Sequence, residues 1–442
     1  MQIKLSDSFD YKRLLRFTMP SIVMMIVTSV YGVVDGFFVS NFVGKTPFAA
    51  VNFVMPFLMM LGGFGFMFGT GGSALVSKTF GERQDRRARS IFSLVIYVSI
   101  ACGAVIAALG FIFIRPITAA LGASGELLDL CVVYGRINLV AMPLYLLQFE
   151  FQSFCVTAEK PNLGLVTTVA SGVTNILLDT LFIVVFDWGI VGASVATAIS
   201  QALGGLIPLV YFAVPNRSLL RLTRTSFDGK ALLKTCTNGS SELLSNISMS
   251  LVGMLYNVQL LKYAGENGVA AYGVLMYVNM IFIAVFIGYS VGSAPIIGYN
   301  YGAQNYGQLR SLLRKSLVLI CSSSVAMFAI SQVLAKPLSA IFVGYDPSLL
   351  ELTCRGFFIF SFSFLFAGLA IFGSSFFTAL NNGLVSAVVS FLRTLVFQIA
   401  AVLLLPLIWE IDGIWASVVV AELAAAAVNV VFLVGMRKRY KY

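Results

Sequence analysis

Apolar runs of about 20 residues recur along the whole sequence, and this recurrence most constrains the fold. Each run is long enough to cross a hydrocarbon core of about 30 Å as an α-helix. Because lipid offers no partner for backbone N–H and C=O groups, such runs must be helices rather than open strands. With 59% hydrophobic and only 11% charged residues, a water-soluble fold could not cover this apolar surface. The sequence therefore predicts an all-α integral membrane protein.

The apolar pattern predicts twelve transmembrane helices. They are expected at 14–38, 49–75, 91–114, 131–156, 162–185 and 188–213, then at 240–262, 269–297, 314–334, 352–378, 384–408 and 413–436. An even number of spans places both termini on the same side of the membrane.

The basic residues indicate which side this is. With a cytoplasmic N-terminus, the inner segments hold 22 Lys and Arg residues, whereas the outer segments hold only Lys45, Arg115, Lys262 and Lys336. This asymmetry follows the positive-inside rule. We therefore expect a multi-pass protein of the cell membrane with both termini in the cytoplasm. Nucleic-acid binding would be another use for a net charge of +10, but the topology accounts for the charge and no nucleic-acid partner is expected.

The second half of the sequence aligns with the first half when it is shifted by about 221 residues. Phe80-Gly81 aligns with Tyr301-Gly302, and Arg89-Ser90 aligns with Arg310-Ser311. The two halves are therefore parallel repeats of six spans, an arrangement that transporters use with the substrate path between the halves. We expect two pseudo-symmetric six-helix bundles, an N-terminal lobe at 1–225 and a C-terminal lobe at 226–442.

Two carboxylates lie within the predicted spans of the first half at similar depths. Asp35 and Asp179 each fall roughly 5–10 Å below the outer boundary at 1.5 Å per residue. Asn175 is one helical turn from Asp179, and Thr197 enters the sixth span from the outer side. Charge is costly at this depth, so these oxygen-bearing side chains predict a site for Na⁺ or a transferable proton. The plainer alternative is a single buried Asp paired with a neighbouring amide or Arg.

The second half lacks these charges. The equivalent of Asp35 falls at Tyr256 or Asn257, and that of Asp179 falls near Gln398. Two other acidic residues in the spans, Glu242 and Glu422, have no assigned role. Arg393 is a possible partner of Glu422. Glu150 either lines an inner vestibule or reaches the membrane surface.

Pro20 removes a backbone hydrogen bond from the first span and is a candidate hinge below Asp35, with a static bend as the alternative. The sequence contains no histidine and no combination of nucleophile and base, so we expect no enzyme and no cofactor other than a coupling ion.

These residues resemble the multidrug and toxic compound extrusion (MATE) transporters over essentially the whole chain. The most specific matches are Pro20…Tyr31-x-x-x-Asp35 in the first span and Asn175-x-x-x-Asp179 in the fifth. They are similar to the cation site in the N-terminal lobe of the DinF-like branch. The resemblance implies that Asp35, Asn175, Asp179 and Thr197 are cation ligands or proton carriers. It also makes Tyr31, Gln152 and Glu150 candidates for the substrate cavity.

The resemblance implies a secondary active exporter of amphipathic, often cationic compounds in exchange for Na⁺ or H⁺. We expect a monomer with the lipid bilayer and amphipathic small molecules as its partners. The alternative is a flippase for lipid-linked precursors, which would need a cationic groove open to the bilayer. A membrane enzyme or receptor is a third class. Oxygen ligands suit Na⁺ and H⁺ equally, so the sequence leaves the coupling ion open.

Overall fold

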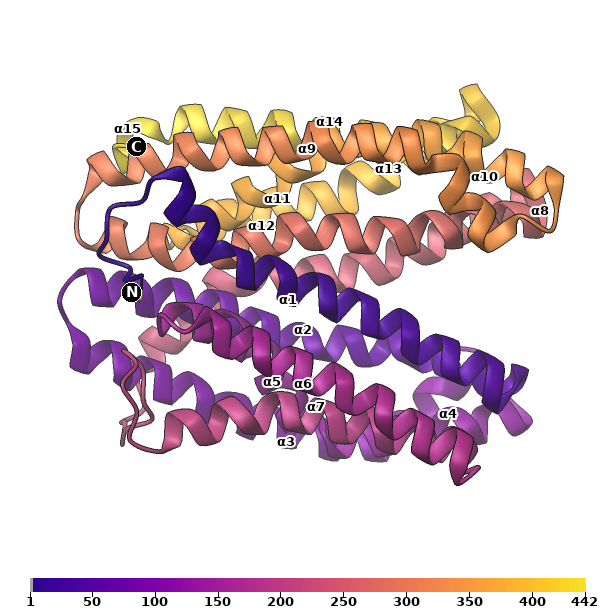
Figure 1. Ribbon diagram of the computed structural model, residues 1–442, viewed down its shortest axis with the longest axis horizontal. Coiled ribbons are helices and arrows are strands. Elements are labelled where there is room, and N and C mark those ends of the chain that lie inside the picture. Colours follow the sequence, from indigo (N-terminus) through magenta and orange to yellow (C-terminus); the bar gives the residue numbers. More distant parts are fainter. Residues whose placement is uncertain (1–2) are drawn as a thin grey trace.

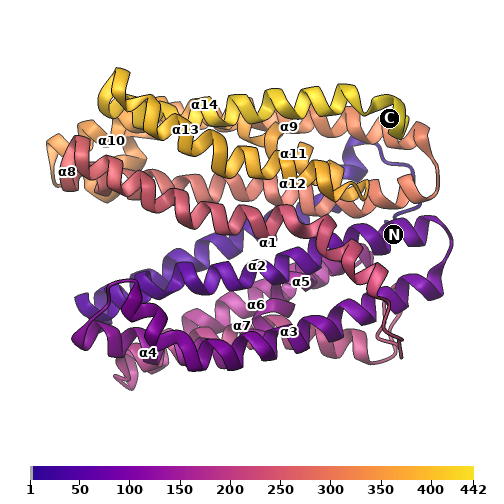
Figure 2. The same cartoon turned by 180° about the vertical axis from the view of Figure 1, so that it is seen from behind.

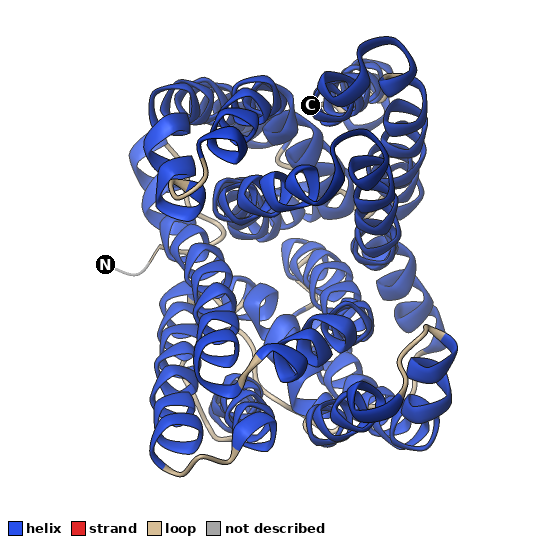
Figure 3. Ribbon diagram, turned by 90° about the vertical axis from the view of Figure 1, so that its right-hand side faces the viewer, coloured by secondary structure: helices blue, strands red, loops and turns tan. Residues whose placement is uncertain are grey.

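The computed structural model describes residues 3–442 and, within them, every side chain except those of Ser40 and Lys45. Every regular element among these residues is a helix (Figure 3). The first half contains α1 (Tyr11–Phe38), α2 (Lys45–Gly81), α3 (Asp85–Ala120), α4 (Gly125–Val140), α5 (Met142–Thr157), α6 (Pro161–Asp179) and α7 (Gly189–Ala213). The second half contains α8 (Gly229–Gly302), α9 (Tyr306–Val343), α10 (Pro347–Phe360), α11 (Phe364–Ala379), α12 (Gly383–Phe391), α13 (Phe397–Leu404), α14 (Pro406–Gly435) and α15 (Arg437–Tyr440).

Four short segments of other helix types interrupt or extend these α-helices. Three are π-helical, η1 (Val39–Val43), η2 (Thr180–Val185) and η4 (Leu392–Val396), and η3 (Ser361–Ser363) is a 3₁₀ turn.

The helices account for the twelve predicted spans. Within the described residues, ten helices are long and apolar enough to cross a membrane, and the bent pair α4 and α5 makes an eleventh span. The twelfth arises because α8, with 74 residues, is two helices joined at Gly265, where the backbone has φ 62° and ψ −152°. The protein is therefore a multi-pass membrane protein, as the apolar pattern predicted.

Two details of the predicted spans were wrong. The seventh span starts at Gly229, not at 240, whereas the break expected between the seventh and eighth spans is present as a kink at Gly265. The fourth span is not one straight helix, because α4 and α5 meet at an angle of 60°. Hydrophobicity alone cannot locate such changes, because neither a positive φ nor a bend alters the apolar pattern.

The helices form two lobes that lie side by side. Helices α1 to α7 make one lobe and α8 to α15 the other, with both termini at the same end of the molecule (Figures 1 and 2). We call this the terminal end. The remaining end, where α4 and α10 lie, is the opposite end.

At the terminal end the lobes touch through α2 and α8. A Cβ on Gly81 would lie 2.1 Å from the carbonyl oxygen of Tyr299, and one on Gly302 would lie 2.0 Å from that of Lys78. The two contacts exchange under the 221-residue shift found in the sequence. Backbones approach this closely only where a side chain is absent, as at other helix interfaces in membranes. The sequence repeat thus corresponds to an approximate two-fold symmetry between the lobes at this interface.

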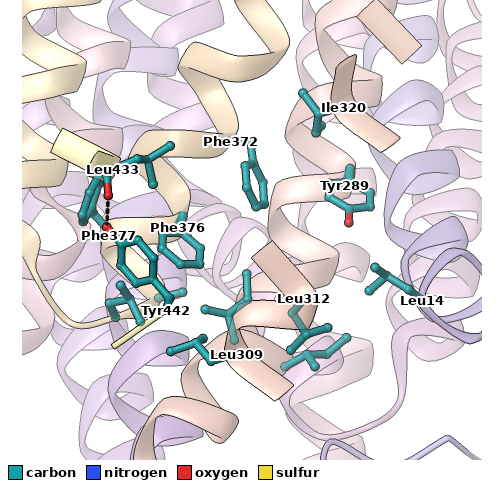
Figure 4. Close-up of a cluster of buried hydrophobic side chains, with 14 of the residues drawn as sticks. Leu14, Tyr289, Leu309, Leu312, Ile320, Phe372, Phe376, Phe377, Leu433 and Tyr442 are labelled. Atoms are coloured by element: carbon teal, nitrogen blue, oxygen red, sulfur yellow. Dashed lines mark hydrogen bonds between the residues drawn. The ribbon is translucent and has the colours of Figure 1, made fainter. Parts of the chain in front are cut away.

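A buried apolar cluster extends this contact between the lobes. Leu14 of α1 packs with residues of the second lobe, including Tyr289, Leu312 and Phe372 (Figure 4). Farther from the terminal end, four glycines of α1 and α8 have no atom within 4 Å of an added Cβ: Gly32, Gly253, Gly265 and Gly273. The tight contacts between the lobes are therefore concentrated in the terminal half.

Candidate functional site

Helices α1, α6 and α7 bring the four predicted coupling residues together. Asp35, Asn175, Asp179 and Thr197 are all buried, with at most 6% of each residue exposed. The Thr197 hydroxyl donates a hydrogen bond of 3.4 Å to Oδ1 of Asp35, and the side chains of Asp179 and Asn175 face the same carboxylate. The i, i+4 spacing on α6 places Asn175 and Asp179 on one helix face. The geometry thus supports one site rather than isolated buried residues.

The site holds more acceptors than donors. Among the described residues, neither oxygen of Asp179 has a hydrogen-bond partner, and Oδ1 of Asn175 has none either. Two adjacent buried carboxylates cannot both stay ionised and unpaired, so the pair needs a shared proton or a bound cation. These unpaired oxygens fit a small hard cation such as Na⁺. In the described part of the chain, no three His, Cys, Asp or Glu side chains gather into a potential metal site.

Both aspartates lie next to π-helical segments. The α-helix α1 ends three residues after Asp35 and continues as η1, while Asp179 is the last residue of α6, directly before η2. A π segment shifts the hydrogen-bond ladder by one residue and recurs at functional sites. The local backbone of each helix is therefore irregular where the carboxylates meet.

Two tyrosines and a glutamine surround the carboxylates. The Tyr31 hydroxyl lies one turn before Asp35 and faces the Gln148 amide of α5. Tyr134 of α4 faces Thr197, and its hydroxyl is buried close to both aspartates. Neither Tyr134 nor Gln148 was predicted from the sequence as a site residue. Within an apolar span, the sequence does not distinguish a tyrosine at a functional site from a tyrosine in the core, because the ring packs well in either place.

The remaining cavity candidates lie on α5. Gln152, one turn after Gln148, is buried, and its amide has no hydrogen-bond partner in the described structure. Glu150 projects to another side of α5. The α5 backbone at Glu150 packs on Gly69 of α2, and its fully buried carboxylate faces the Ser99 hydroxyl of α3. Glu150 thus neither reaches the membrane surface nor borders an open space in this conformation.

Helix α1 continues through Pro20 without a break. On either side of this proline, α1 packs against the second lobe: a Cβ on Gly288 would lie 2.5 Å from the Ile22 backbone, and one on Gly292 would lie 3.0 Å from that of Thr18. Whether Pro20 acts as a hinge stays a prediction.

The second lobe replaces the carboxylates with a neutral pair. The Tyr256 hydroxyl donates a hydrogen bond of 2.7 Å to Oε1 of Gln398, at or near the positions that the repeat aligns with Asp35 and Asp179. The pairing proposed from the sequence for Glu422 is confirmed, because the Arg393 guanidinium donates to both of its oxygens over 2.8 to 3.1 Å. Glu242 lies near Arg393 without forming an ion pair at 4 Å in the described structure.

Two pseudo-symmetric helical lobes with a buried carboxylate pair in one of them define a multi-pass membrane transporter. The comparison with known families agrees. The chain belongs to the MatE family, whose sequence model matches residues 20–181 and again residues 243–404. The double match places one copy of the family unit in each lobe. This family is a class of transporters and not of enzymes.

The curated relatives extend over nearly the whole chain. The multidrug export protein MepA of Staphylococcus haemolyticus is 24% identical over 434 residues, which cover 98% of this chain and 95% of MepA. MepA of Staphylococcus aureus strain NCTC 8325 is 24% identical over 432 residues, covering 96% and 94%.

Solved structures share the fold. A crystal structure of MATE in complex with MaL6 superposes with a TM-score of 0.93 at 22% identity and 98% coverage of both chains. An outward-facing multidrug resistance MATE family transporter of the MOP superfamily gives a TM-score of 0.92 at 22% identity, covering 98% of this chain and 97% of its own. The predicted two-bundle fold is confirmed.

Proposed function

We propose that this protein is a secondary active exporter that expels amphipathic, cationic compounds in exchange for Na⁺ or H⁺. The observation that carries the proposal is the buried pair Asp35 and Asp179, in which neither oxygen of Asp179 has a hydrogen-bond donor within the described structure. The full-length similarity to proteins named for multidrug export supports bulky amphipathic compounds as the substrates. The position of the pair in the first lobe supports a DinF-like coupling site.

The distribution of charge supports the orientation. The terminal end carries most of the Lys and Arg residues outside the spans, so it faces the cytoplasm of a cell membrane. We assign residues 1–225 and 226–442 to the two lobes and expect a monomer, because each chain contains both walls of the substrate path.

In the proposed cycle, the described conformation is open to the outside. The close glycine contacts between the lobes lie at the terminal end, which supports closure on the cytoplasmic side. A cation that binds at Asp35 and Asp179 shifts the equilibrium between outward-open and inward-open states by its differential affinity for them. The drug shifts the same equilibrium in the opposite direction, and this reciprocity is the basis of exchange.

We assign Tyr31 and Gln152 to the substrate side of the first lobe, because Tyr31 faces Gln148 one turn before Gln152 on α5 and the buried amide of Gln152 has no hydrogen-bond partner in the described structure. Glu150 would join them only if α5 separates from α2, because its carboxylate is buried. Pro20 would serve as the hinge of α1, since the missing N–H lowers the cost of bending there.

A flippase for lipid-linked precursors finds no support. Such a protein needs unpaired basic groups for a pyrophosphate within the bilayer, but Arg393 is neutralised by Glu422. The named relatives point to drug export instead.

The test is transport in proteoliposomes with a fluorescent cationic dye, with a Na⁺ gradient and a pH gradient imposed separately. Asp35→Asn and Asp179→Asn each remove a charge without changing the side-chain volume. We expect both variants to fold and to lose gradient-driven export. The matched control is Asp129→Asn, because Asp129 is exposed and paired with Arg115 at 3.1 Å. It should transport as the wild type does.

The gradient that drives wild-type export identifies the coupling ion. Export by both aspartate variants at the wild-type rate would refute the assignment of the site. Dye export driven by neither gradient would refute secondary active export itself.

A further inference from the structure

We propose that the protein binds a phosphate-bearing anion in a basic pocket between the two lobes at the terminal end. The pocket has a volume of about 430 Å³ and is bordered by the end of α2, the start of α3 and the start of α8. We call it the basic pocket. Its charged residues are Lys78, Glu82, Arg87, Lys230 and Lys234.

Positive charge in the basic pocket is in excess. Four cations and one carboxylate give a formal charge of +3. Lys78 pairs with Glu82 at 3.5 Å, but within the described structure no carboxylate lies within 4 Å of Arg87, Lys230 or Lys234. The Nζ atom of Lys234 donates to the carbonyl oxygen of Asn381 at 2.7 Å, which holds the side chain in place without neutralising it. The pocket thus has the charge that a multivalent anion needs.

The start of α3 adds to this field. The basic pocket borders the first turn of α3, where N–H groups without a side-chain cap carry partial positive charge. Asp228 caps α8 by accepting from the N–H groups of Lys230 and Ala231, so its carboxylate is already engaged. Basic pockets between membrane helices on the cytoplasmic side bind phosphate head groups of lipids.

The repeat provides an internal comparison. At a shift of 221 residues, the cations Lys78, Arg87 and Lys230 align with the uncharged Tyr299, Gln308 and Phe9, and Lys234 aligns with Arg13. Three of the four cations therefore have no charged equivalent. A general rule that loops on this side are basic would not gather cations from both lobes around one pocket and leave the repeat-related positions mostly uncharged. The basic pocket is therefore an addition to the scaffold and not a requirement of it.

The position between the lobes gives the anion a role. Lys78 belongs to the first lobe and Lys234 to the second, and their ammonium groups lie close enough to repel each other. A bound anion would replace this repulsion with attraction to both lobes. It would therefore stabilise the conformation in which the lobes are in contact at the terminal end. This role concerns the closed end only and does not depend on the proposed drug or coupling ion.

The test measures binding and thermal unfolding of the purified full-length protein at constant ionic strength. One arm uses nanodiscs of phosphatidylglycerol against nanodiscs of phosphatidylcholine, and the other uses inorganic pyrophosphate against chloride. We expect the anion to raise the unfolding temperature. The double variant Lys230→Gln, Lys234→Gln should bind about fivefold more weakly per charge removed, which corresponds to about 1 kcal/mol for each charge.

The control double variant is Lys12→Gln, Lys438→Gln, which removes the same charge from exposed positions near the termini. It should bind almost as the wild type does, and Lys230→Arg, Lys234→Arg should restore binding. An effect of phosphatidylglycerol alone would identify a lipid head group, and an effect of pyrophosphate would identify a soluble phosphate. Equal losses in both double variants, or no effect of either anion, would overturn the proposal.

Discussion

Breaking the buried ion pair of the second lobe should be the most destabilising single charge change in the protein. Arg393 donates three hydrogen bonds to Glu422, and the two side chains are only 17% and 7% exposed. The substitution Glu422→Gln keeps the shape but leaves the guanidinium without its counter-charge. Removing one partner of a buried pair costs about 3–5 kcal/mol, because the remaining charge stays desolvated.

The exposed pair Arg115 and Asp129 is the matched reference. Its atoms lie 3.1 Å apart, but the side chains are 56% and 64% exposed. Water already solvates both charges, so Asp129→Asn should cost about 1 kcal/mol or less. The two single variants thus make the same chemical change at similar distances and differ in burial.

The assay is thermal unfolding of the purified variants in one detergent, together with the double variant Arg393→Met, Glu422→Met. We expect a large loss of stability for Glu422→Gln, a small one for Asp129→Asn, and recovery of most of the loss in the double variant, since no buried charge then remains. Equal losses for the two single variants would refute the reasoning.

Two further predictions concern the lobes. Gly302→Val should destabilise the contact at the terminal end, because its Cβ would lie 2.0 Å from the Lys78 carbonyl oxygen, whereas Gly435→Val, with no atom within 4 Å, should be tolerated in the same unfolding assay. Tyr256→Phe should cost about 1–3 kcal/mol by leaving the amide of Gln398 without its donor, yet leave the coupling ratio between dye and ion unchanged; a changed ratio would contradict a purely structural role for this pair.

The sequence predicted those features of the molecule that depend on burial and spacing. The cost of charge in lipid made Asp35 and Asp179 conspicuous, and helical periodicity placed Asn175 beside Asp179; all three meet in the structure. The 221-residue repeat identified Tyr256 or Asn257 and the region of Gln398 as the uncharged equivalents of the two aspartates, and Tyr256 and Gln398 form a hydrogen bond in the structure.

Other features could not be predicted from the sequence because they depend on the rotation of a helix about its axis or on a single backbone angle. Tyr134 reaches the coupling site because α4 turns its hydroxyl inward, and apolar runs do not report that direction. The kink within α8 depends on a positive φ at Gly265, a conformation that glycine permits but that the presence of a glycine does not by itself predict.

Because the two lobes differ in buried charge, we expect α1 to have a specific role in transport. The equivalent of the proposed coupling site in the second lobe is a neutral hydrogen-bonded pair, so of these two equivalent sites only the one in the first lobe would change its charge on binding a cation. The change must still reach the interface between the lobes. Helix α1 carries Asp35 near the opposite end and packs closely on Gly288 and Gly292 of α8 on both sides of Pro20. A shift of α1 on cation binding would therefore act directly on the contact that closes the terminal end.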